Sequence, residues 1–183
     1  QDFHAETIRF FILSSHYRSP INFSDTALKE SHTALSRLYH ALKPFEVVET
    51  DETVWDGEHG QAFVRAMNDD FNTAQAMSVL FEVAGEINKA VKADDMAGGL
   101  KFAVILKTLA RVLNIAQTAP KAFLQAQIGD ESISESEILA MIDKRKQAKA
   151  DKDFALADQI RAELEKQGVA LEDSRSGTSW RRV

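Results

Sequence analysis

Apolar residues recur at helical spacing through most of the first 117 residues, and this periodicity constrains the fold more than any other feature of the chain. The clearest stripe is formed by Leu28, Leu35, Leu38 and Leu42, with Ser24 at the position of an N-cap. The pattern predicts helices over residues 4–15, 24–43, a segment ending near 67, 72–91 and 96–117. Short polar connectors between amphipathic helices are typical of a helical bundle. We therefore expect an antiparallel helical bundle over residues 1–117.

The remaining residues follow a different pattern. Residues 118–133 lack a sustained apolar stripe and are predicted to be a linker. Ser134 and Glu137 have the spacing of a capping box, which predicts one helix to about residue 150 and a second to Gln167, with Gly168 as the C-cap. The segments "VALED" and "TSWRRV" flank "SRSG" and are predicted to pair as a β-hairpin. The expected fold class is thus mainly α: a bundle followed by a small α+β domain over residues 134–183.

Composition excludes several classes of function. The chain has no cysteine, which rules out disulfides, thiolate nucleophiles and cysteine-ligated zinc. No run of residues reaches the length and apolarity of a membrane span, so no membrane contact is expected. The five histidines are scattered without metal-ligand spacing, and Gly98-Gly99 is no phosphate-binding loop, so neither metal nor catalytic residues are predicted. The net charge of −6 argues against a general nucleic-acid binder, although residues 134–183 alone are neutral, with ten basic and ten acidic side chains.

One cluster of residues does suit a ligand. Basic side chains near the end of the first helix of the terminal domain, Arg145, Lys146, Lys149 and Lys152, are followed by Phe154, and then by Asp158 and Arg161. Cations hold phosphates, an aromatic ring stacks on a base, and carboxylates accept hydrogen bonds from base N–H groups, so this combination favours single-stranded RNA. Two alternatives stay open. The basic residues have the character of a solvated face, and Phe154 shares a helical stripe with the core candidates Ala157 and Leu164.

Two polar clusters in the first domain also have ordinary structural explanations. Arg18, in "SHYRSPINFS", stands beside Tyr17 where a helix is expected to end, and basic residues stabilise helix C-termini. The acidic pair Asp69-Asp70 is better explained by capping of the next helix than by a cation.

Three stretches together resemble the C-terminal part of bacterial cysteinyl-tRNA synthetase: "HAETIRFFILSSHYRSPINFS", "MNDDFNTAQAMSVLFE" and "KDFALADQIRAELEKQGVALEDSRSGTSWRR". They span nearly the whole chain. In that family a catalytic domain carries a His-x-Gly-His signature, a zinc site with cysteine and a Lys-Met-Ser-Lys-Ser loop, and none of these is present here. The resemblance therefore implies a fragment that is inactive by itself and holds no cofactor, whereas the intact enzyme uses zinc and ATP to attach cysteine to tRNA(Cys).

The same resemblance implies a cytoplasmic protein whose partners are tRNA(Cys) and the missing catalytic domain. The bundle is expected along the inner stems of the tRNA, and the terminal domain at the GCA anticodon. In the resemblance, Lys149 matches a position that is commonly Arg or Lys. Phe154 matches an aromatic position that is suited to stacking on a base. Asp158 and Asp173 match acidic positions that are suited to hydrogen bonds with base edges. The further RNA-binding candidates, in addition to those four residues, are Arg18, Arg145 and Arg161. Trp180 has two open roles, in the hairpin core or against RNA. The alternative to tRNA binding is a standalone helical adaptor for protein–protein contacts.

Overall fold

The protein is described by a computed structural model that covers residues 3–45, 48–126, 133–174 and 177–182. It divides between Phe123 and Leu124 into two compact units, which we call the bundle unit (residues 3–123) and the terminal unit (residues 124–183). The division falls inside the range predicted to be a linker. None of the helices in the described ranges is long and apolar enough to cross a membrane.

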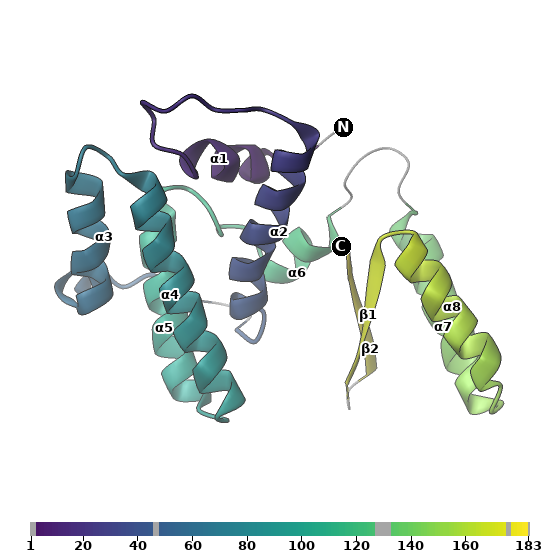
Figure 1. Ribbon diagram of the computed structural model, residues 1–183. Coiled ribbons are helices and arrows are strands. Elements are labelled where there is room, and N and C mark those ends of the chain that lie inside the picture. The colour runs from purple at the N-terminus through teal and green to yellow at the C-terminus, as the bar shows by residue number, and fades with distance from the viewer. Residues whose placement is uncertain (1–2, 46–47, 127–132, 175–176, 183) are drawn as a thin grey trace. The chain divides into compact units, whose positions relative to one another are not determined.

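The bundle unit contains five α-helices and one 3₁₀ helix in its described residues, with α6 beginning at its end. Their bounds are α1 (Ala5–Leu13), α2 (Asp25–Leu42), the 3₁₀ helix (Glu52–Asp56), α3 (Glu58–Asn68), α4 (Thr73–Lys92), α5 (Met96–Val112) and α6 (Pro120–Gln125). Helix α4 packs against α2, α3 and α5, and α1 packs against α2 (Figure 1). The predicted N-cap Ser24 accepts from a backbone N–H group at the start of α2, and the Asn72 side chain does the same at the start of α4.

The terminal unit is the predicted helical pair with a β-hairpin. Helices α7 (Glu135–Ala150) and α8 (Phe154–Lys166) pack on each other, and β1 (Val169–Ser174) pairs antiparallel with β2 (Gly177–Arg182) (Figure 1). The capping box of Ser134 and Glu137 is formed, and Gly168 ends α8 with φ of 73°. The buried core consists of Ile138, Ile160, Leu164, Val169, Leu171 and Trp180. The predicted fold class is confirmed.

Two features of the bundle unit differ from expectation. Helix α5 ends at Val112 and not near residue 117, because the chain turns through Asn114 and Ala116, which have φ of 51° and 55°. The predicted linker contains α6, whose Phe123 and Leu124 are buried. A helix of six residues is too short to reveal itself by periodicity. Part of the predicted linker, residues 127–132, lies outside the described residues.

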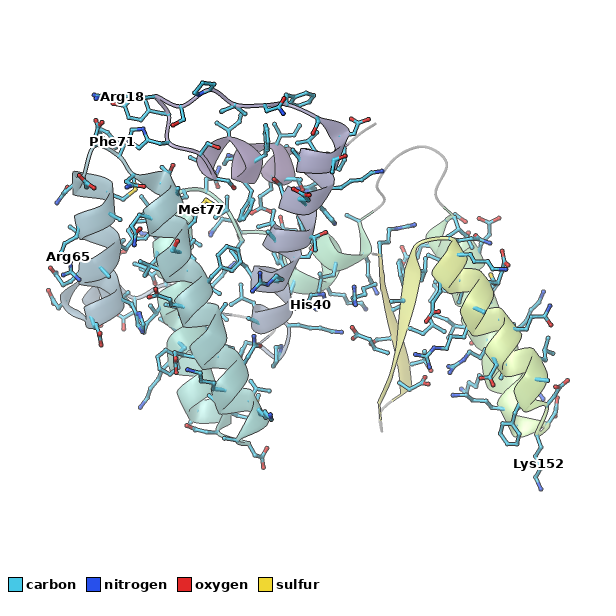
Figure 2. All side chains as sticks on the ribbon, in the orientation of Figure 1. Arg18, His40, Arg65, Phe71, Met77 and Lys152 are labelled. Atoms are coloured by element: carbon cyan, nitrogen blue, oxygen red, sulfur yellow. The ribbon has the colours of Figure 1, made fainter. Side chains whose placement is uncertain are left out.

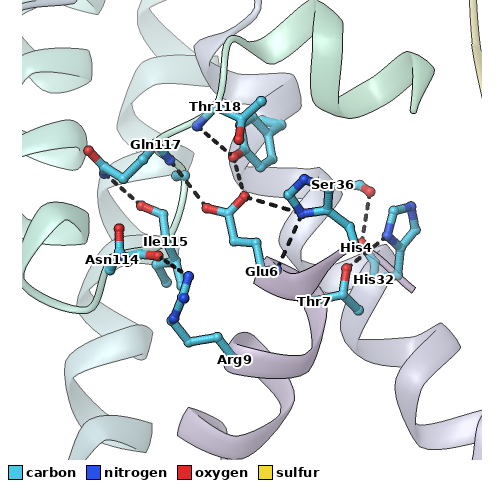
Figure 3. A network of polar contacts seen from close by, with 12 residues as sticks. His4, Glu6, Thr7, Arg9, His32, Ser36, Asn114, Ile115, Gln117 and Thr118 are labelled. Carbon is cyan, nitrogen blue, oxygen red and sulfur yellow. Dashed lines mark hydrogen bonds and ion pairs between the residues drawn. The ribbon is translucent and has the colours of Figure 1, made fainter. Parts of the chain in front are cut away.

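A buried polar network ties the segment after α5 to the first two helices (Figure 3). The Glu6 carboxylate, in α1 and 4% exposed, accepts from the Tyr39 hydroxyl at 2.5 Å and from the Gln117 backbone N–H at 3.2 Å. The same hydroxyl accepts from the Thr118 backbone N–H at 3.2 Å. Burial and the bond to Glu6 raise the pKa of Tyr39, so the phenol stays protonated. The polar atoms of this buried site thus have partners, as burial demands.

Replacement of Tyr39 by phenylalanine is expected to lower the free energy of unfolding by about 1 kcal/mol, because Glu6 and Thr118 each lose a hydrogen-bond partner inside the protein. Urea unfolding monitored by circular dichroism measures the change. A matched Tyr17→Phe variant removes an exposed hydroxyl and serves as the control. Equal stability of the two variants would contradict a structural role for the network.

His32 gives the bundle unit a predictable acid sensitivity. Its ring stacks on Phe123 with centroids 5.3 Å apart, and its Nδ1 lies 3.2 Å from the Thr7 hydroxyl. Burial, and secondarily the nearby His4, lowers the pKa of His32. Below the ordinary histidine pKa of about 6.5, the unfolded chain therefore takes up the proton before the folded chain does, and stability falls as the pH falls. We expect His32→Gln to lose less stability than the wild type between pH 7.5 and 5.5 in thermal unfolding. Identical pH dependence of His32→Gln and the wild type would refute the assignment.

Candidate nucleic-acid interface

The centre of the predicted site is the carboxylate of Asp173, near the end of β1. Hairpin register places Asp173 opposite Thr178, two residues along from the buried pair of Leu171 and Trp180. Because side chains on one face of a strand recur every second residue, Asp173 faces the same side as this core. Its carboxylate thus meets the helical pair, where it contacts Arg145 and Lys149.

Three side chains hold this carboxylate. Arg145 in α7 donates from both guanidinium NH2 groups, at 3.0 Å to Oδ1 and 2.9 Å to Oδ2. The Thr178 hydroxyl donates to Oδ1 at 2.7 Å, and the Lys149 ammonium donates to Oδ2 at 3.2 Å. The bonds from Arg145, Thr178 and Lys149 hold the pKa of Asp173 well below its usual range. The carboxylate is therefore ionised at neutral pH.

Arg145 is buried, with only 4% of its surface exposed, and its Nε atom has no hydrogen-bond partner. The bond to Asp173 raises the pKa of this arginine, which keeps the cation charged despite burial. The structure therefore places Arg145 behind Asp173 and not on the exposed surface where the sequence analysis expects an RNA contact.

Phe154 lies at the surface. It is the first residue of α8, and 63% of it is exposed, whereas its stripe partners Ala157 and Leu164 are buried. The core interpretation of Phe154 is thus wrong, and its ring is free to stack on a ligand. Trp180, at 5% exposure, takes the core role of the two that the sequence left open.

The other basic groups near Phe154 are exposed too. The side chain of Lys149 is 44% exposed on the last turn of α7, and Lys152 stands on the turn before α8 (Figure 2). Because α7 and α8 form an antiparallel pair joined by this short turn, the end of α7 and the start of α8 are neighbours. The structure therefore brings two exposed lysines, one exposed aromatic ring and one ionised carboxylate to one end of the terminal unit.

Asp158 and Arg161 lie farther along α8 and are exposed. Asp158 is one helical turn beyond Phe154, and its negative charge contributes to the raised pKa of Arg145. The Nε atom of Arg161 lies 3.6 Å from Glu165, an ordinary surface ion pair within the helix. Thr178 was missed by the sequence analysis, although the predicted hairpin register could have placed it opposite Asp173.

Arg18 belongs to the bundle unit and to a separate cluster. Its guanidinium lies 5.3 Å from the centre of the Tyr17 ring, and it forms an ion pair with Asp70 at 3.1 Å. Tyr17 also donates to Asp70 at 2.8 Å, and this bond raises the pKa of the tyrosine. Asp70 thus holds the loop after α1 rather than capping α4, a role that Asn72 fills. In the part of the chain that the structure describes, no three histidine or acidic side chains are placed to hold a metal ion.

Comparison with known proteins supports the family resemblance. Residues 62–117 match the DALR domain family. Along 97% of its length the chain is 51% identical to a cysteine–tRNA ligase of Psychrobacter cryohalolentis, and along its full length it is 50% and 47% identical to cysteine–tRNA ligases of Acinetobacter baylyi and Acinetobacter baumannii. It spans about two fifths of the length of these curated relatives, 39% of the first and 40% of the other two. The resemblance to the C-terminal part of bacterial cysteinyl-tRNA synthetase that the sequence motifs predict is therefore confirmed, and over its whole length the chain is similar to a part of these ligases.

Proposed function

We propose that the chain is a tRNA-binding part of a cysteine–tRNA ligase and that its terminal unit contacts the anticodon loop of tRNA(Cys) and reads the GCA anticodon. The observation that carries the proposal is the placement of the exposed Phe154 ring at the same end of the unit as Lys149 and the ionised Asp173. The relatives are named as ligases of cysteine and tRNA, which supports tRNA as the partner.

Each group in the terminal unit has a distinct role in this proposal. The Phe154 ring stacks on an unpaired base, which binds any base and adds affinity without sequence preference. Lys149 and Lys152 attract phosphates, with an effect that weakens as salt rises. The carboxylates of Asp173 and Asp158 accept from base N–H groups and supply the discrimination between bases. Arg145 acts through Asp173, which it orients, and Arg161 adds positive charge on the same helix.

The bundle unit is proposed to contact the inner stems of the tRNA, with Arg18 as its candidate residue. The catalytic reaction, which attaches cysteine to tRNA(Cys) with ATP, is proposed for the intact ligase, as is its zinc site. For this chain we propose no cofactor, and we expect no cysteine-dependent exchange between ATP and pyrophosphate, with or without added zinc. Exchange above that of a buffer control would contradict this division of roles.

The decisive experiment is a binding titration of the whole chain with tRNA(Cys) transcripts. Tighter binding to the GCA transcript than to one with a changed anticodon, together with weaker binding as salt rises, is the expected result. Equal affinity for the two transcripts would contradict anticodon reading. Binding of neither, with salt-insensitive binding to a protein partner, would favour the adaptor function instead.

A further inference from the structure

The hydrogen-bonding capacity of Asp173 is already used up in the free protein. An ionised carboxylate has about four positions at which a donor can bind. Arg145 occupies two of them, Thr178 a third and Lys149 the fourth. A base N–H group therefore finds no open acceptor position on this carboxylate and must displace one of the present donors.

The three partners differ in how easily they leave. Arg145 is buried and holds the carboxylate through two parallel bonds, a geometry that resists separation. Thr178 is fixed opposite Asp173 by the pairing of the two strands. Lys149 makes a single bond of 3.2 Å at the end of a long side chain, and both its side chain and that of Asp173 are more than 40% exposed, at 44% and 42%. An exposed lysine–carboxylate pair is weak, so Lys149 is the partner that a ligand displaces.

We propose that the Lys149 ammonium occupies the position on Asp173 that a nucleobase N–H group takes in the complex, and that RNA binding exchanges the one for the other. The proposal rests on the function proposed above and adds which group occupies the Asp173 carboxylate in the absence of RNA. Because Arg145 and Thr178 stay in place, the carboxylate keeps its orientation through the exchange. The released ammonium returns to water, and its positive charge attracts the phosphates of either RNA whether or not it is paired with Asp173.

The exchange has a measurable consequence for discrimination. An RNA with a matching base must break the Lys149–Asp173 pair, whereas an RNA that offers no N–H group at that position leaves it intact. The Lys149–Asp173 pair therefore weakens binding of the matching RNA but not of the mismatched one, and so reduces the ratio of their affinities. Removing the ammonium while keeping the length of the side chain, as in Lys149→Met, removes this advantage.

The experiment is a titration of the whole chain with anticodon stem-loops that carry GCA or a change at one of its three positions. Asp173→Asn first identifies the position whose discrimination depends on the carboxylate. At that position Lys149→Met is expected to increase the ratio of the two dissociation constants about two- to five-fold, the range that an exposed ion pair supplies, while both RNAs bind more weakly. Lys152→Met, which removes an exposed lysine from the neighbouring turn, is the matched control: it should weaken binding without changing the ratio (Figure 2).

A direct readout is the nitrogen-15 resonance of the Lys149 ammonium. It should shift on addition of the GCA stem-loop and keep its free-protein position with the mismatched one. If the wild type binds and discriminates but Lys149→Met leaves the ratio unchanged or lowers it, the exchange is refuted and the proposed function stands. If the wild type binds no stem-loop, the proposed function fails, and the exchange fails with it.

Discussion

Replacement of Arg145 by alanine is expected to destabilise the terminal unit by about 2–3 kcal/mol, the largest effect that we predict for a single substitution in this unit. Removing one partner of a fully buried ion pair generally costs about 3–5 kcal/mol. Here the side chain of Asp173 is 42% exposed, so water solvates part of the abandoned carboxylate and reduces the loss. Lys149 and Thr178 also remain bonded to it. Most of the cost therefore comes from lost packing and from the pair of bonds that crosses from α7 to β1.

Trp180 reports on this unit, because it lies in the terminal core, whereas the other tryptophan, Trp55, belongs to the bundle unit. Urea unfolding monitored by tryptophan fluorescence in a Trp55→Phe background isolates the transition. Arg161→Ala removes an arginine whose only described ion pair is exposed, and it should change stability by less than about 0.5 kcal/mol. A loss for Arg145→Ala no greater than for this control would show that the buried pair has no structural role.

The Arg145–Asp173 pair also makes the stability of the terminal unit depend on pH under acidic conditions. Because the folded pKa of Asp173 is depressed, its contribution to stability is fully present above the ordinary aspartate pKa of about 3.9 and is lost as the pH falls below it. Arg145→Ala removes the main cause of the depressed pKa and should therefore flatten this acid-dependent part of the stability curve.

Local patterns were sufficient to predict most of the fold. Helix starts depend on a side chain and a backbone N–H group three residues apart, so Ser24 and Ser134 could be assigned from the sequence alone. The hairpin follows equally from short-range chemistry. Its two strands pair in the register that places Leu171 opposite Trp180, which puts two large apolar side chains together on the core face.

Interactions between distant residues could not be predicted in this way. Arg145 belongs to a basic run that looks like a solvated face, and only its contact with a carboxylate 28 residues away explains its burial. Glu6 resembles any acidic residue in a first helical turn until Tyr39 and Gln117 are seen to surround it. In both cases burial of a charged group depends on partners that the fold supplies, and the local sequence pattern does not reveal these partners.

Phe154→Ala is expected to weaken binding of the GCA anticodon stem-loop about ten-fold while leaving the fold intact. Stacking of one base on an aromatic ring contributes about 1–3 kcal/mol, and a ten-fold change corresponds to about 1.4 kcal/mol. The unfolding free energy should change by less than about 0.5 kcal/mol, because the ring is 63% exposed and packs in no core. Loss of affinity and preserved stability together separate a ligand contact from a packing role.

Two kinds of matched control are available, one at Leu156 in the same helix and the others at Phe154 itself. Leu156 is exposed as well, at 43%, but has no π face, so Leu156→Ala should leave affinity nearly unchanged. Phe154→Trp should retain or increase affinity, since its larger ring also stacks, and Phe154→Leu should resemble alanine although it keeps apolar bulk. Equal losses for Phe154→Ala and Leu156→Ala would mean that general apolar surface holds the RNA. Because stacking is insensitive to base identity, Phe154→Ala should also weaken matched and mismatched stem-loops by the same factor, whereas Asp173→Asn should act mainly on the difference between them.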